Sequence, residues 1–182
     1  MKYIAFLIAA VLPLAACNSD PEVSAENASA EEVAQKIEAA AGSGSFVNPG
    51  LWRTTMTIEE MSVPGMPPEA AAEMEKMQGR TTSDEKCLTP EDVKKPKEDF
   101  FGGEENCRYE RFTMGNGKID AVMNCSGDGA SQKMTMAGTY SGDAYNMRMQ
   151  VQPAGGGETA GMGMKMRVDA TRVGECTGEE SG

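Results

Sequence analysis

The chain has 182 residues, with 28 acidic against 17 basic side chains, no histidine and a formal net charge of −11 at pH 7. Nucleic acid and anionic lipid head groups repel a chain this acidic, so we expect neither as a partner. The lack of histidine excludes catalytic dyads, triads and metal sites that depend on imidazole.

The first 17 residues have the layout of a bacterial export signal. Lys2 precedes an apolar run that ends in Leu14-Ala15-Ala16-Cys17, and this ending resembles the lipobox of bacterial lipoproteins. The resemblance implies that residues 1–16 are removed as a signal peptide and that Cys17 is acylated, which holds the protein on a membrane. We therefore expect a periplasm-facing lipoprotein of the cell envelope. Asn18 stands where an aspartate would favour the inner membrane, so the outer membrane is slightly favoured.

Residues 17–45 are rich in Ala, Glu, Ser and Gly, which predicts a flexible acidic tether that carries one short helix. Ser29 and Glu32 have the spacing of a capping box, and Val33 and Ile37 follow at helical spacing, so the helix is expected over about Ala30–Ala41. The sequence Gly42-Ser43-Gly44-Ser45 is expected to end it as a linker.

Residues 46–176 are predicted to form one mainly β globular domain, followed by a disordered tail at 177–182. Apolar and polar residues alternate with the period of a half-buried strand, and turn signals such as Gly115-Asn116-Gly117 separate the runs. The pattern predicts an antiparallel meander of about seven strands, in which each strand pairs with its predecessor, as a curved sheet or a partly closed barrel. The expected strands are Leu51–Met61, Arg80–Leu88, Cys107–Met114, Lys118–Cys125, Gln132–Tyr140, Ala144–Gln152 and Met162–Val173. Short helical insertions are expected at Glu69–Gln78 and after Thr89.

Methionine recurs at every second position in three of these strands, so each set is expected to project from one face. The candidate residues for lining a hydrophobic ligand site are Met134, Met136, Met147, Met149, Met164 and Met166. Three interpretations remain open. Methionine can simply fill the core, it can line a deformable cavity for a hydrophobic small molecule, or its thioethers can bind copper(I) in the periplasm.

Four cysteines remain once Cys17 is assigned to lipid, namely Cys87, Cys107, Cys125 and Cys176. An even number in an oxidising compartment predicts two disulfides, and the sequence allows three pairings. We favour Cys87 with Cys107 and Cys125 with Cys176, because the first would enclose one short helical segment and the second would tie back the last strand. The spacing of the cysteines and the lack of histidine argue against zinc, so no metal site is assigned and no cofactor is expected.

Enzymatic activity is not expected. The chain carries no glycine-framed serine elbow, phosphate-binding glycine loop or calcium loop, and cysteines held in disulfides are poor nucleophiles. No catalytic residue is assigned. An envelope hydrolase that uses paired carboxylates is kept as an alternative, although 28 acidic residues guarantee accidental pairs.

Several segments together resemble the exported bacterial domain of unknown function 3617, over about residues 48–176. They are Pro49-Gly50-Leu51-Trp52, Pro64-Gly65-Met66-Pro67, Cys87-Leu88-Thr89-Pro90-Glu91-Asp92, Met114-Gly115-Asn116-Gly117-Lys118-Ile119, Met134-Thr135-Met136 with Gly138-Thr139-Tyr140, and Arg172-Val173-Gly174-Glu175-Cys176. The resemblance implies an exported, often lipid-anchored β-rich domain without assigned activity. The expected function is a non-enzymatic binding or structural module whose partners are the membrane, through Cys17, and a hydrophobic small molecule or an envelope protein.

Overall fold

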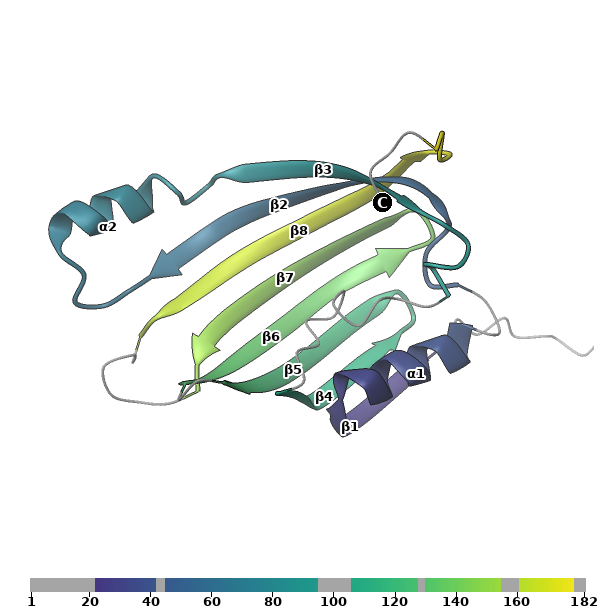
Figure 1. The fold of residues 1–182 in the computed structure, drawn as a ribbon, viewed down its shortest axis with the longest axis horizontal. Helices are drawn as coiled ribbons and strands as arrows, with labels where there is room; N and C mark the ends of the chain where they lie inside the picture. Colours follow the sequence, from purple (N-terminus) through teal and green to yellow (C-terminus); the bar gives the residue numbers. More distant parts are fainter. Residues whose placement is uncertain (1–21, 42–44, 95–105, 128–129, 155–160, 179–182) are drawn as a thin grey trace, which may run out of the picture.

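A computed structural model describes residues 22–41, 45–94, 106–127, 130–154 and 161–178. The described chain forms one sheet of eight antiparallel strands with two short helices (Figure 1). The strands are β1 (Val23–Ser29), β2 (Gly50–Ser62), β3 (Thr81–Leu88), β4 (Cys107–Gly115), β5 (Lys118–Gly127), β6 (Ala130–Ser141), β7 (Ala144–Pro153) and β8 (Gly163–Gly174). The helices are α1 (Ala30–Ala41) and α2 (Pro68–Glu75). The mainly β prediction is confirmed, and all seven expected strands are present.

The prediction of a free tether is wrong for residues 23–41. Strand β1 pairs with β4 along its length, and α1 buries Val33 and Ile37 against the core. The expected helix is confirmed at its predicted bounds, because the Ser29 hydroxyl accepts a hydrogen bond from the Glu32 amide while the Glu32 carboxylate accepts one from the Ser29 amide. The expected signal peptide, residues 42–44 of the expected linker and most of the expected tail at 177–182 lie outside the described residues.

The strand order is β1-β4-β5-β6-β7-β8-β2-β3. The meander is therefore confirmed from β4 to β8, but the expectation that every strand pairs with its predecessor is wrong for β4, which pairs with β1 and β5 and not with β3. The β2–β3 hairpin instead lies beside the last strand, β8 (Figure 1). The described sheet is open, with β1 and β3 as its edges. Within the described residues, neither helix is of a length and apolarity that would cross a bilayer.

The core lies on one face of the sheet, where α1 packs against β1 and β4. Its largest fully buried side chains are Trp52, Tyr109 and Phe112, together with Val33 and Ile37 of α1. The Tyr109 and Phe112 rings meet edge to face at 5.4 Å, a geometry that adds to their burial. Helix α1 is thus a part of the folded domain.

Replacing Ile37 by alanine tests this docking. Ile37 is 1% exposed, and truncating a buried isoleucine is expected to lower the free energy of unfolding by about 3 kcal/mol. Urea unfolding followed by circular dichroism measures the change. Glu38→Ala, on the neighbouring exposed position of the same helix, is the matched control and should lower the free energy of unfolding by less than about 1 kcal/mol, the scale of an exposed polar contact. If Ile37→Ala were as stable as the parent, α1 would not be docked on the sheet, and residues 23–41 would behave as a tether.

The two disulfides join Cys87 to Cys176 and Cys107 to Cys125, with Cα–Cα distances of 5.5 Å and 4.0 Å. The favoured pairing is therefore wrong, although the prediction of two disulfides from these four cysteines is confirmed. A register shift between Tyr109 and Arg111 explains one bond, because it brings Cys107 directly opposite Cys125 on the β4–β5 hairpin. The other bond follows from the strand order, since β3 and the end of β8 both flank β2.

Burial makes Tyr109 sensitive to alkaline pH. The core raises the pKa of Tyr109 to about 12, from 10.0, because burial disfavours the charged phenolate. The folded state therefore holds its proton more tightly than the unfolded state, so the stabilisation is complete below pH 10 and is lost as the pH rises towards 12. We expect the parent to lose about 1 to 2 kcal/mol more than Tyr109→Phe between pH 9 and pH 11.5 in urea unfolding. Parallel losses in the two proteins would contradict the assignment.

Candidate functional site

The candidate site is one surface of the sheet, which we call the methionine face. The register places Met136 opposite Met149 and Met149 opposite Met166, so three neighbouring strands present methionine in one row. In the next row Met134 lies opposite Val151, which lies opposite Met164. Met147 belongs to a third row, opposite Val168. The structure thus brings all six predicted lining residues to one face.

Helix α1 covers only part of this face. It contacts β1 and β4, and Met136 and Met147 are buried in the core beside it, at 5% and 9% exposure. Met149, Met164 and Met166, on β7 and β8, are only half-buried. Among the described residues, α1 is the helix that packs on the sheet, so the face changes from a covered core over β4 and β5 to a partly accessible apolar surface over β7, β8 and β2.

Strand β2 extends the accessible part with residues that were not predicted as lining. Met56 lies opposite Val168 and is 41% exposed, and Ile58 lies opposite Met166. A register shift between Ile58 and Glu60 then brings Met61 opposite Met164, on the same face. Simple alternation along β2 predicts Met61 on the opposite face of the sheet. The bulge moves it to the methionine face, so the sequence pattern alone did not identify it as a lining residue.

The opposite face of the sheet is charged and its charges are paired. Glu59 lies 3.7 Å from Arg148 and 3.8 Å from Arg167, and Lys165 lies 2.6 Å from Glu60. Each such exposed pair contributes little to the free energy of unfolding, but the charged groups keep this face of the sheet hydrated. The two faces therefore differ sharply: one is apolar and rich in sulfur, the other ionic.

Hydrogen bonds hold the pKa of two carboxyl groups, Glu32 and Glu110, below its usual value. Hydrogen bonds from the Ser29 amide and hydroxyl lower the pKa of Glu32, and hydrogen bonds from Asn124 and Lys133 lower the pKa of Glu110. A catalytic acid needs a raised pKa in order to hold its proton near neutral pH. In the part of the chain that the structure describes, no three Cys, Asp or Glu side chains are grouped so as to hold a metal ion.

A hollow of about 310 Å³ lies where β2, β7 and β8 end. Its lining is mixed, with Glu60, Gln150 and Lys165 from the charged face and Met162 and Met164 beside them. Glu60 and Lys165 pair with each other across its wall, and Ser62 and Gln152 add further polar side chains to the lining. The hollow therefore differs from the apolar methionine face, although Met164 borders both.

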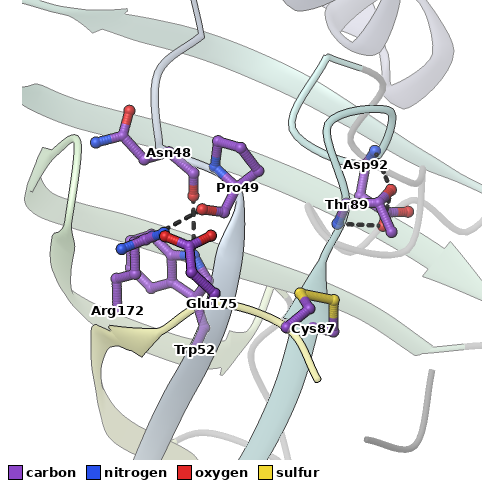
Figure 2. Close-up of a disulfide and its surroundings, with 9 residues drawn as sticks. Asn48, Pro49, Trp52, Cys87, Thr89, Asp92, Arg172 and Glu175 are labelled. Atoms are coloured by element: carbon purple, nitrogen blue, oxygen red, sulfur yellow. Dashed lines mark hydrogen bonds and ion pairs between the residues drawn. A yellow bond between two sulfur atoms is a disulfide. The ribbon is translucent and has the colours of Figure 1, made fainter. Parts of the chain in front are cut away.

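Three segments that carry the family resemblance meet at the other end of β2, in a cluster that we call the clasp: Asn48, Pro49, Trp52, Cys87, Arg172 and Cys176 (Figure 2). The Trp52 indole N–H donates to the Asn48 carbonyl at 3.0 Å, and the Arg172 Nε donates to the Pro49 carbonyl at 2.7 Å. Arg172 also pairs with Glu175. These contacts fasten the start of β2 to the end of β8, which indicates a structural role.

Two other features lie next to the clasp. Gly50 has φ +144, and a Cβ there would lie 2.4 Å from the Arg172 Nε and 2.6 Å from the Gly174 carbonyl, so only glycine allows this close approach. The expected helix after Thr89 is instead a hydrogen-bonded turn over residues 90–94. Thr89 and Asp92 exchange hydrogen bonds as in a capping box, at 2.9 and 3.2 Å (Figure 2).

The proposed lipidation site, Cys17, lies outside the described residues. In comparison with known proteins, the family model described as a protein of unknown function (DUF3617) matches residues 47–176. No curated protein and no solved structure matches the chain. The three segments of the clasp all lie within the matched range.

Proposed function

Since the chain belongs to the DUF3617 family of proteins of unknown function, we propose that it is a lipid-anchored cell-envelope protein whose methionine face binds a hydrophobic ligand without catalysis. The observation that carries the proposal is the accessible half of that face, over β7, β8 and β2. Met56, Met149, Met164 and Met166 leave apolar surface in contact with solvent there. Contiguous apolar surface on a soluble domain marks a site of interaction.

Methionine suits a ligand of varied shape. Its side chain is unbranched, has three rotatable bonds and carries a polarisable sulfur, so a surface of methionines can repack around different apolar groups. The open sheet leaves room for such repacking, because β1 and β3 do not close into a barrel. A hydrophobic small molecule can therefore lie along the row that contains Met149 and Met166.

Native mass spectrometry of the protein extracted from cell envelopes tests ligand binding. We expect a co-purifying apolar molecule with the parent protein and its loss from Met149→Glu, because a charge in the middle of the face must be desolvated when the ligand binds. Gln150→Glu is the matched control, since it adds the same charge one residue along β7 on the opposite face. A parent protein free of ligand, or equal retention in both variants, would overturn the proposal.

The anchor is proposed from Leu14-Ala15-Ala16-Cys17. It is supported by two disulfides, which form and persist in oxidising compartments outside the cytoplasm. The outer membrane is the proposed site. Cys17→Ser is expected to release the protein from the membrane pellet into the soluble fraction. Separation of inner and outer membranes on a sucrose gradient shows which of the two membranes carries the parent protein. Continued sedimentation of Cys17→Ser with membranes would contradict lipid anchoring.

A further inference from the structure

The row formed by Met136, Met149 and Met166 has a property that a hydrophobic surface does not require. The three residues occupy directly paired positions on three consecutive strands, β6, β7 and β8. Side chains directly opposite each other on antiparallel strands have Cβ atoms about 5 Å apart. Each sulfur lies three bonds from its Cα, so the thioethers of the outer two residues can both reach a point above the central one.

Strand propensity does not explain this choice of residue. Strands favour β-branched and aromatic side chains such as Val, Ile and Tyr, and the same rows do contain Val151, Val168 and Ile58. Any of these would supply an apolar surface. What methionine adds at three paired positions is sulfur.

Further thioethers surround the row. Met134 and Met164 lie two residues along β6 and β8 on the same face, and Met61 lies opposite Met164. Met149, Met164 and Met166 are half-buried, so an ion can reach them from solvent. The row is therefore rich in sulfur and can be reached from the side of Met149 and Met166, whereas Met136 is buried.

Thioether sulfur is a soft ligand, and soft ligands select copper(I) among biological metal ions. A hard cation such as Mg²⁺ or Ca²⁺ would require oxygen ligands instead. The four cysteines of the domain are held in disulfides, so their sulfurs do not compete for the ion. The net charge of −11 also favours the approach of a cation.

We propose that Met136, Met149 and Met166 form a thioether site for one copper(I) ion on the methionine face. The step is simple coordination, without a change in the oxidation state of the metal. It goes beyond the proposed function, because it depends on the sulfur atoms rather than on apolar surface.

Anaerobic titration of the full chain with copper(I), against a coloured copper(I) chelator, tests the site. The titration is done in a Cys17→Ser background, which removes the one cysteine outside the disulfides and with it any binding by a free thiol. We expect one ion per chain, with sulfur as its only ligand by X-ray absorption. Met149→Leu should weaken binding by about 10- to 100-fold, and replacing all three methionines by leucine should abolish it.

The matched control replaces Met66, Met74 and Met77, three methionines in and around the α2 segment, by leucine, and should leave the affinity unchanged. Leucine preserves apolar surface and removes sulfur, so the triple variant of the face should keep its fold while it loses the metal. Circular dichroism confirms that each variant is folded. The copper(I) site would be contradicted if the parent failed to bind copper(I), or if the triple variant bound it as tightly as the parent. Either result would leave the proposed binding of a hydrophobic ligand untested and unchanged.

Discussion

Replacing Cys87 and Cys176 together by alanine is expected to lower the free energy of unfolding by about 4.5 kcal/mol, close to the whole stability of many small domains. The two cysteines are 89 residues apart, so their bond restricts most of the unfolded domain, and the entropy removed from the unfolded chain grows with the length of the closed loop. The bond also joins the end of the edge strand β3 to the segment after β8. Its removal frees both segments at once.

The other disulfide provides the comparison. Cys107 and Cys125 are only 18 residues apart on one hairpin, and their replacement by alanine should cost about 3 kcal/mol. Guanidinium unfolding of both double variants, without reductant, measures the difference. Non-reducing peptide mapping of the parent should yield a Cys87–Cys176 peptide pair. A larger loss from the hairpin pair than from the long-range pair would contradict the loop-length argument, and a Cys87–Cys107 peptide pair would contradict the structure.

Replacing Trp52 by alanine is expected to lower the free energy of unfolding by about 4 kcal/mol. Trp52 is 2% exposed and stacks on Tyr145 with ring centroids 5.7 Å apart. The truncation therefore leaves a large cavity, and the Asn48 carbonyl loses its donor. Because β2 begins at this point, we expect the β2–β3 hairpin to lose protection from hydrogen exchange before β5 and β6 do.

Two further variants separate the contributions of Trp52. Trp52→Phe keeps a ring against Tyr145 but loses the hydrogen bond to Asn48, so a smaller loss of about 1 to 2 kcal/mol is expected. Val173→Ala, at a position that is 41% exposed near the same end of β8, should change the stability by less than about 0.5 kcal/mol. Far-ultraviolet circular dichroism is the suitable probe, since Trp52 is the chain's only tryptophan. A loss below 1 kcal/mol for Trp52→Ala would show that the clasp does not secure β2.

The methionine face connects the two proposals and allows them to be tested apart. A charge at Met149 should remove an apolar ligand, whereas leucine at the same position should weaken the binding of the metal ion because it removes a sulfur. Helix α1 bears on both, because it covers the face over β4 and leaves Met149 and Met166 accessible. The part of the surface that remains open is therefore a consequence of where α1 docks.

Strand β1 was not predicted from the sequence, and the reason is physical. Its buried positions are filled by the small side chains of Val23, Ala25 and Ala28, and the pairing skips Asn27, which has a positive φ of 49°. The apolar alternation is therefore weak and breaks after two repeats. In a segment rich in Ala and Glu, such a pattern is hard to distinguish from that of a tether.

The amino-acid sequence by itself determined the positions of seven strands, the start of α1 at Ser29 and the common face of the six methionines, because these follow from side-chain periodicity and from capping and turn chemistry within a few residues. Only the tertiary structure decided the partners of the cysteines, the place of the β2–β3 hairpin beside β8 and the half of the face that α1 covers. These features depend on contacts between residues far apart in the chain and on bulges near Glu110 and Glu59, each of which shifts the register by a single residue.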